Sequence, residues 1–230
     1  NYTSAYFYRG YSYERLDQDQ NAINDYNRVI QLDPDYAMAY NNRGVSYDEL
    51  GQYQTAINDY TKAIQLDPDD ALAYNNRGIA YLQLRETNPF GPIHDPDERA
   101  IQDFDKAIQL DPGYAMAYCY RGDAYRNLGE NLRAIQDYDK AIQLDPDYGT
   151  VAMFGRHNAH RDLDRNELDI LDYDKAIQLD PGNDFAYFSR GNTYEDMGQR
   201  QKAIDDYRKA ILLDRRWVLE LDPKEYAAEL

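Results

Sequence analysis

His157 and His160 are the residues whose types and spacing come closest to a reactive site. They stand three positions apart, which places both imidazoles on one face of a helix, and Asp162 and Asp164 follow them. Two histidines at this spacing can bind zinc weakly, but the glutamate and the third ligand of a metalloprotease motif are missing. A metal-dependent sensor at this pair is therefore a minor alternative, and we expect no resident metal or other cofactor.

Clusters of acidic residues offer no better site. Asp17, Asp19 and Asn21 resemble the opening of a calcium loop, but neither the glycine at its sixth position nor the glutamate at its twelfth follows. Asp205 and Asp206 lie in a segment where Asp and Lys alternate, which is typical of a solvated helix face. No Gly-rich phosphate loop and no nucleophile elbow occurs. The sequence therefore predicts that this chain is not an enzyme.

The charge balance restricts the class of partner. The chain has 42 acidic and 25 basic residues and a net charge of -17, whereas nucleic acids and anionic membranes require clustered Lys and Arg. We therefore expect a neutral or basic protein or peptide partner, no nucleic acid and no membrane span. Cys119 is the only cysteine, so no intrachain disulfide is possible. A cytoplasmic location is favoured, and a start at Asn1 rather than Met is consistent with a truncated N-terminus.

Copies of one 34-residue unit must position these residues. In the clearest copy, Tyr40, Gly44 and Tyr47 recur at i, i+4 and i+7, which places a large, a minimal and a large side chain on one helix face. That helix ends near Gly51, and a second helix ends before Pro68. A helical hairpin of this size buries its apolar faces only by stacking on further copies. The sequence therefore predicts an all-α solenoid.

Six copies follow one another, with two irregular members. The third copy has ten extra residues between its helices, and the fifth is one residue longer and lacks a clear Tyr-Gly-Tyr series. In the last copy Arg215 replaces the terminal proline, and Asp222 and Pro223 predict the start of a short capping helix. The predicted repeats are 3–36, 37–70, 71–114, 115–148, 149–183 and 184–217, followed by a capping helix at 218–230.

The spacing and the recurring aromatic, Gly, Tyr, Ala, aromatic, Ala and Pro residues resemble the tetratricopeptide repeat family. This resemblance implies a right-handed superhelical solenoid of stacked antiparallel helix pairs, with the first helices lining the concave face. It also implies a protein–protein interaction scaffold or adaptor. Family members that clamp acidic chaperone tails use Lys, Asn and Arg at set positions. Those positions hold Phe7, Tyr11, Asn42, Leu72 and Asn76, so we do not expect a carboxylate clamp.

The concave face supplies the predicted site. Packing uses the Tyr-Gly-Tyr face of each first helix, so repeat positions 2, 5, 9 and 12 should face solvent. Apolar residues recur there, and paired asparagines supply donors and acceptors for the backbone of an extended peptide. The alternative is that neighbouring repeats bury part of this stripe and the asparagines bond within their own helices. The predicted groove residues are Met38, Asn41, Asn42, Val45, Asp48, Leu72, Asn75, Asn76, Ile79, Leu82, Met116, Cys119, Asp123 and Arg126.

The insertion in the third repeat predicts a second contact surface. It contains Pro89, Phe90, Pro92 and Ile93, an apolar and proline-stiffened set on the rim of the groove. This rim loop either contacts a partner or packs locally through Phe90. A homo-oligomer, formed through the groove or through the ends of the array, is the alternative use of the same apolar surfaces.

Overall fold

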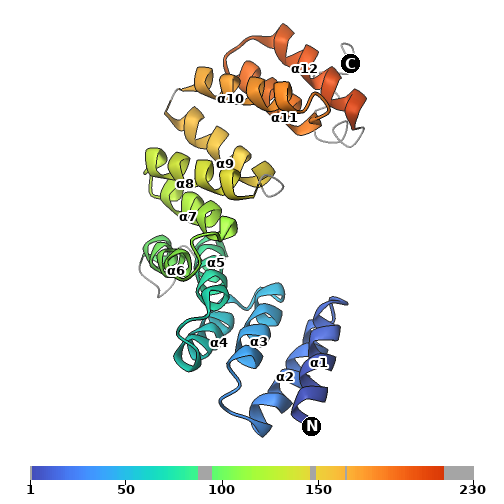
Figure 1. Ribbon diagram of the computed structural model, residues 1–230, viewed down its shortest axis with the longest axis vertical. Helices are drawn as coiled ribbons and strands as arrows, with labels where there is room; N and C mark the ends of the chain where they lie inside the picture. Colours follow the sequence, from blue (N-terminus) through green and yellow to red (C-terminus); the bar gives the residue numbers. More distant parts are fainter. Residues whose placement is uncertain (1, 88–94, 146–148, 164, 215–230) are drawn as a thin grey trace. The chain divides into compact units, whose positions relative to one another are not determined.

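The computed structural model describes residues 2–87, 95–145, 149–163 and 165–214, and every regular element in these ranges is an α-helix (Figure 1). The predicted all-α class is confirmed. The rim loop and the capping helix predicted at 218–230 lie outside the described residues. The helices are α1 (Tyr2–Glu14), α2 (Asp19–Leu32), α3 (Ala37–Glu49), α4 (Tyr53–Leu66), α5 (Ala71–Thr87), α6 (Pro96–Leu110), α7 (Ala115–Asn127), α8 (Asn131–Leu144), α9 (Gly149–Asp162), α10 (Asn166–Leu179), α11 (Asp184–Asp196) and α12 (Arg200–Leu213).

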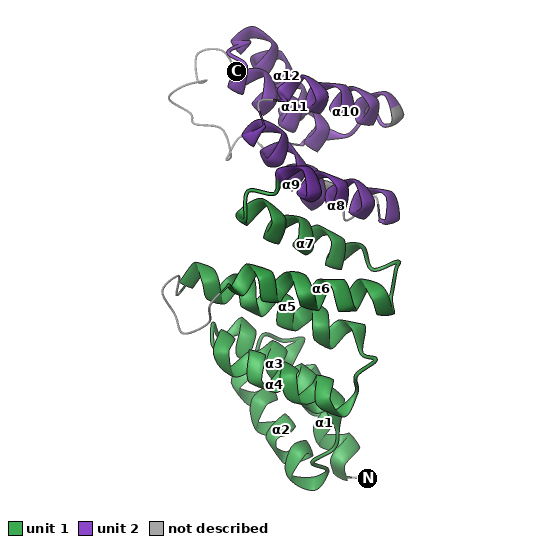
Figure 2. Ribbon diagram, turned by 90° about the vertical axis from the view of Figure 1, so that its left-hand side faces the viewer, with its two compact units in different colours: residues 1–130 green, residues 131–230 purple. Residues whose placement is uncertain are grey.

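The chain divides into two compact units (Figure 2). Unit 1 spans residues 1–130 and contains α1 to α7, whereas unit 2 spans residues 131–230 and contains α8 to α12. In unit 1, the pairs α1–α2, α3–α4 and α5–α6 form hairpins, and each second helix also packs on the first helix of the next pair. In unit 2, α11 and α12 form the same kind of hairpin, and α9 packs more closely on α8 than on α10. A solenoid is an array in which each hairpin contacts only the hairpins before and after it.

Local sequence sets the ends of these helices. Gly51 follows α3 with a φ of +71°, and its N–H donates to the carbonyl of Asp48 at 2.8 Å. This left-handed conformation closes the helix without steric cost because glycine lacks a Cβ. At the other end of the hairpin, Asp67 is extended because Pro68 follows it. Within the described residues, none of the helices combines the length and the apolar character that crossing a membrane requires.

The two helices of a hairpin pack through a glycine on the first helix and an aromatic ring on the second. A Cβ added at Gly44 would lie 2.7 Å from the ring of Tyr60, and one added at Gly78 would lie 2.6 Å from the ring of Phe104. Both rings are buried. In unit 2 the ring of Tyr138 on α8 meets Gly155 on α9, so the contact there joins a second helix to the first helix of the next pair. The two helices can approach this closely only because no side chain stands between the backbone and the ring.

Gly78→Leu should therefore lower the free energy of unfolding by about 1 to 3 kcal/mol, the usual cost of overpacking a well-filled core. The added side chain must displace Phe104 or separate α5 from α6. Urea denaturation of the purified chain measures the change. Gly113→Ala is the control, because Gly113 is exposed in a turn and this change should cost less than about 0.5 kcal/mol. Equal midpoints for wild type and Gly78→Leu would contradict the packing described here.

Candidate functional site

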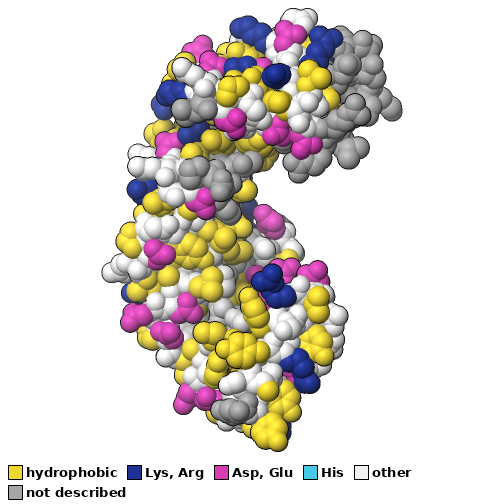
Figure 3. Space-filling model, turned by 45° about the vertical axis from the view of Figure 1, so that its right-hand side comes forward, with side chains coloured by type: hydrophobic (Ala, Val, Ile, Leu, Met, Phe, Trp, Pro, Cys, Tyr) yellow, Lys and Arg dark blue, Asp and Glu magenta, His cyan; other side chains and the backbone are white. Residues whose placement is uncertain are grey.

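The first helices of unit 1 form a hollow, named here the inner-face hollow. Its volume is about 550 Å³, and its walls come from α1, α3, the start of α5 and the turn before α5. Hydrophobic side chains gather over these N-terminal helices in the lower part of Figure 3. The residues lining the hollow are Phe7, Tyr8, Tyr11, Met38, Asn41, Asn42, Asp67, Asp70 and Leu72.

Large apolar side chains around this hollow remain open to solvent. Tyr8 is 67% exposed and Met38 56%, and Tyr11 and Leu72 are also among the exposed large hydrophobic residues. The helices bearing them are already anchored by other side chains, such as Phe7, which packs against Tyr26. Apolar surface that the fold itself does not need, gathered around a hollow, is typical of an interaction site.

The asparagines of the predicted groove form a network across helices. Asn76 Nδ2 donates to Asn41 Oδ1 at 3.2 Å, and Asn41 Nδ2 donates to Asn42 Oδ1 at 3.2 Å. Asn42 Nδ2 in turn donates to the hydroxyl of Tyr26 at 3.4 Å. Asn41 is 3% exposed and Asn75 is fully buried, so the prediction that these two side chains face solvent is wrong. The neighbouring repeat covers them, because the first helices of successive hairpins contact one another.

The network ends at a carboxylate. The Tyr26 hydroxyl donates to Glu14 Oε2 at 2.9 Å, and burial raises the pKa of both groups. Asn75 stands apart from the chain of amides, because its Nδ2 lies 3.7 Å from Met116 Sδ. The hydrogen bonds therefore fix the orientation of Asn41 and Asn42 at the inner-face hollow, and they leave Asn75 in a purely internal role.

The other predicted groove residues do not line the inner-face hollow. Leu82 belongs to the core cluster of unit 1, and Val45 and Ile79 are half-buried against that cluster. Cys119 is buried, which raises the pKa of its thiol to about 12 and contradicts a solvent-facing position. The remaining members are half-buried and line no part of the hollow: Asp48, Asn76, Met116, Asp123 and Arg126.

Sequence reasoning missed the contribution of α1. Phe7, Tyr8 and Tyr11 line the inner-face hollow beside Met38 and Leu72, but none of the three was among the predicted groove residues. Phe7 and Tyr11 occupy positions 5 and 9 of the first repeat, the same positions that Asn41 and Val45 occupy in the second. The solvent-facing repeat positions 2, 5, 9 and 12, applied to the first repeat, would have found Phe7 and Tyr11.

Asp48 is a predicted groove residue whose carboxylate is strongly perturbed. It is half-buried, its Oδ1 has no hydrogen-bond partner within the described residues, and burial raises its pKa to about 7. Glu14 occupies the same repeat position and accepts a hydrogen bond from Tyr26. Because an aspartate is one methylene shorter, Asp48 makes no such bond to Tyr60.

A raised pKa in the folded state makes stability depend on pH. The stabilisation that comes from protonated Asp48 is fully present below the unfolded pKa of about 4. It is lost as pH rises toward 7, because the unfolded chain releases the proton first and the free energy of unfolding falls. Asp48→Asn should therefore stabilise the chain at pH 8, by about 1 to 2 kcal/mol after allowance for partial hydration. Urea denaturation of both proteins at pH 8 and pH 4.5 measures this. A difference that did not shrink at pH 4.5 would contradict the assignment.

His157 pairs with a carboxylate instead of standing free on a helix face. Its Nδ1 contacts Asp169 Oδ2 on α10 and lies 3.2 Å from Thr193 Oγ1 on α11, and all three side chains are buried. His160 is buried as well, which lowers its pKa. Among the residues that the structure describes, no group of three or more His, Cys, Asp or Glu side chains is arranged to hold a metal ion.

This pair occupies two positions that carry small residues in the other repeats. When Arg156 is aligned with Arg43, His157 takes the place of Gly44 and Asp169 takes the place of Ala56. These are the positions at which two helices of a hairpin approach most closely. The exchange of both residues explains why α9 lies less closely on α10 than on α8. The degeneracy of the fifth repeat therefore includes a matched change of two residues.

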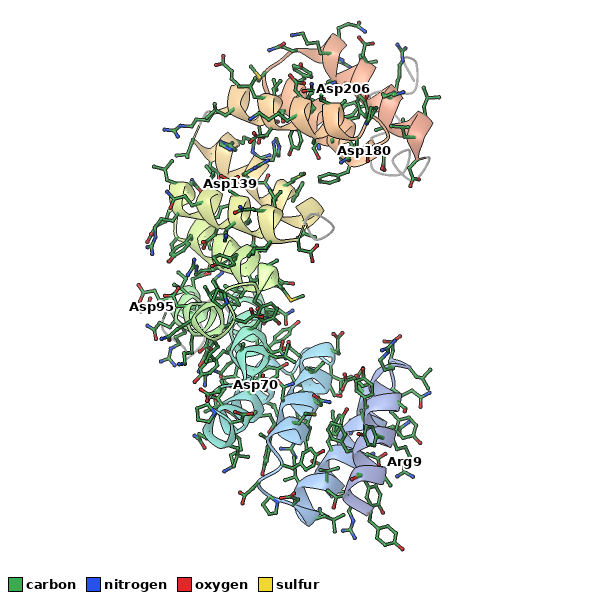
Figure 4. The ribbon with its side chains drawn as sticks, in the orientation of Figure 1. Arg9, Asp70, Asp95, Asp139, Asp180 and Asp206 are labelled. Atoms are coloured by element: carbon green, nitrogen blue, oxygen red, sulfur yellow. The ribbon has the colours of Figure 1, made fainter. Side chains whose placement is uncertain are left out.

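The arginine that precedes the packing glycine binds an aspartate on the second helix of the same hairpin. The sequence did not reveal these contacts. Arg43 of α3 holds Asp59 of α4 through two hydrogen bonds of 2.7 Å, and it also donates to Asn27 of α2. Asp206 of α12 is held by Arg190 in the same way and is 6% exposed (Figure 4). The prediction of a solvated face is therefore wrong for Asp206, although the adjacent Asp205 is exposed.

Comparison with family models identifies the class of protein. The TPR repeat model matches residues 10–51 and 46–84, and the tetratricopeptide repeat model matches residues 115–148 and 185–216. The chain belongs to the tetratricopeptide repeat family. The comparison with curated proteins found no match.

Several solved structures share this fold. The structure of MamA protein covers all of this chain and 96% of its own, at 25% identity and a TM-score of 0.55. YrrB, described as a TPR protein with an unusual peptide-binding site, is 22% identical over 85% of this chain and 96% of its own, with a TM-score of 0.58. A tetratricopeptide repeat protein from Parabacteroides merdae is 18% identical over 95% of this chain and 86% of its own, with a TM-score of 0.70.

Proposed function

We propose that this chain is a non-catalytic adaptor that binds a peptide or protein segment in the inner-face hollow. Tetratricopeptide repeats are in general protein–protein interaction scaffolds, and the fold of this chain is of that class. One observation supports the hollow most directly: exposed Tyr8, Tyr11, Met38 and Leu72 come from three helices and surround one concavity. Burying such side chains against a partner removes apolar surface from water, which favours binding.

The polar groups of the hollow favour a particular ligand. Asn42 lies at the wall with its amide oriented by the hydrogen-bonded network, which suits the backbone of an extended peptide. Asp67 and Asp70 add carboxylates, and Asp70, at the start of α5 (Figure 4), accepts from the backbone N–H of Leu72 at 3.0 Å. Together with the net charge of -17, these carboxylates favour a segment that combines apolar side chains with Lys or Arg.

Selection of peptides on the wild-type chain, followed by affinity measurement on variants, tests the proposal. We expect the selected peptides to bind Met38→Glu/Leu72→Glu at least tenfold more weakly, because two exposed apolar contacts are lost. Leu32→Glu/Leu50→Glu is the matched control. It makes the same charge change at two leucines that are exposed but do not line the hollow.

Thermal melts must show that both double variants are folded. Selected peptides that bind Met38→Glu/Leu72→Glu as tightly as wild type would exclude the inner-face hollow as the site. Self-association through the same surface is tested by light scattering over a range of protein concentrations. A mass that rises with concentration in wild type but not in this variant would assign the hollow to a second copy.

A further inference from the structure

Each unit contains a hollow between two successive second helices, and neither shares a lining residue with the inner-face hollow. In unit 1 it lies between α4 and α6, with Tyr81 of α5 in its lining, and in unit 2 it lies between α8 and α10, with His160 of α9 in its lining. Tyr81 and His160 stand four residues after Arg77 and Arg156, so they hold equivalent repeat positions. Asp95 and Asp139, labelled in Figure 4, each line one of the two hollows.

The two hollows have the same construction but opposite chemistry. Three equivalent positions are polar in the α4/α6 hollow and leucine in the α8/α10 hollow, so the helices supply the same shape with a different lining. Gln54, Arg99 and Gln102 correspond to Leu132, Leu168 and Leu171, in that order.

The leucines are peculiar to this part of the chain. At the position of Leu171, every other second helix carries Asn, Gln or Asp, and at the position of Leu168 every other carries Asn, Thr, Arg or Lys. Leu168 is 47% exposed, and Leu171 and Leu132 are each more than half exposed. Packing of the repeat does not need them, because the same positions are polar elsewhere in the array. Exposed apolar side chains gathered at one hollow point to a contact with another molecule.

His160 provides a second, independent observation. It is 5% exposed, and its Nδ1 has no hydrogen-bond partner within the described residues. His160 lines the hollow, so a turn of its imidazole toward the hollow would let a ligand group bond to this atom and gain the affinity that satisfying a buried polar group supplies. Burial lowers the pKa of His160, which favours the neutral imidazole, and a hydroxyl group can donate to or accept from a neutral ring nitrogen.

We propose that the α8/α10 hollow is a docking site for an amphipathic helix of a partner protein, bearing aliphatic residues on one face, a hydroxyl side chain among them, and basic flanks. The gap between two neighbouring helices matches the ridge of side chains on a third. The net charge of -17 favours a basic partner and disfavours a second copy of this chain, which carries the same charge. This site is separate from the inner-face hollow in both residues and helices.

A helical peptide of Leu and Lys, with leucines at i, i+3, i+4 and i+7 and one serine on the leucine face, is the probe. Fluorescence anisotropy at physiological salt measures its binding to the intact chain. The test variant is Leu132→Gln/Leu168→Thr/Leu171→Asn, which installs the residues of α4 at these positions and leaves the net charge unchanged. We expect it to bind the probe at least tenfold more weakly than wild type. Equal affinity would overturn the proposal.

Met38→Gln/Leu72→Gln is the matched control, because it removes apolar surface from the inner-face hollow with no change of charge. It should leave binding of the probe unchanged, and a loss there would place the peptide in the inner-face hollow instead. Moving the serine along the leucine face should reveal one preferred position in wild type, and this preference should disappear in His160→Phe. If the triple variant does not fold, Leu171→Asn alone tests the site.

Sedimentation velocity tests the remaining alternative, in which a second copy of this chain occupies the α8/α10 hollow. A wild-type chain that dimerises, together with a triple variant that stays monomeric, would assign the α8/α10 hollow to a second copy and overturn the partner proposal. The expected result is no change of mass between the two proteins. The failure of this proposal would leave the inner-face hollow untouched, because the two tests use different variants in different units.

Discussion

Asp206→Ala should lower the free energy of unfolding by about 3 kcal/mol, whereas Asp205→Ala should change it by less than about 0.5 kcal/mol. The two residues are neighbours on α12 and have the same side chain, but their surroundings differ. Both carboxylate oxygens of Asp206 lie 2.7 Å from nitrogens of Arg190, in a bidentate pair that the fold buries. Asp205 is exposed, and its nearest cation, Arg208, is 3.9 Å away.

The large cost arises because the Arg190 guanidinium stays in place after its carboxylate partner is removed. Arg190 of α11 contacts Asp206 of α12 and Asp174 of α10, so its guanidinium ties three helices together. Removing Asp206 leaves this half-buried cation with one carboxylate partner instead of two and leaves most of its hydrogen-bond donors without an acceptor. Urea denaturation of both alanine variants measures the difference. Similar losses for Asp205→Ala and Asp206→Ala would show that the pair contributes no more than a surface ion pair.

Asp169→Ala is expected to destabilise the chain by about 3 kcal/mol or more, and His157→Gly/Asp169→Ala to recover most of that loss. The single change removes the close carboxylate from the buried His157 and leaves only Asp196, whose Oδ2 lies 3.8 Å from His157 Nε2. The double change restores the glycine and alanine that the other repeats carry at these positions. With both large polar groups gone, α10 can approach α9 as the second helix approaches the first in a regular hairpin.

A double-mutant cycle over His157→Gly, Asp169→Ala and the combination measures this coupling, which should reach about 2 kcal/mol. Thr193 contacts both members of the pair, because its Oγ1 lies 3.2 Å from His157 Nδ1 and 3.5 Å from Asp169 Oδ2, but it also has the carbonyl of Ser189 at 3.1 Å, a partner that no variant of the cycle removes. Additive losses would mean that His157 and Asp169 act independently and that the fifth repeat is irregular for another reason.

The hairpin architecture followed from the sequence because its causes are local. Gly44 and Gly78 stand four residues from tyrosines on the same face, and the turn at Gly51 and the stop at Pro68 depend only on their own backbone preferences. Each copy repeats these signals, so their period alone predicts two helices per unit and a packing slot between them. The ring of Phe104 against Gly78 is the result that this reasoning requires.

Tertiary structure decided which of the remaining polar and apolar side chains are exposed and which groups they contact. Asn41 and Asn75 read as solvent-facing from helix geometry alone, but the next repeat covers them, and Asn41 bonds across helices to Asn76. Similarly, Asp206 differs from Asp205 only because Arg190 on another helix reaches it. A residue's exposure depends on atoms that are distant in sequence, so periodicity can assign a side chain to a helix face but cannot tell whether another helix lies against that face.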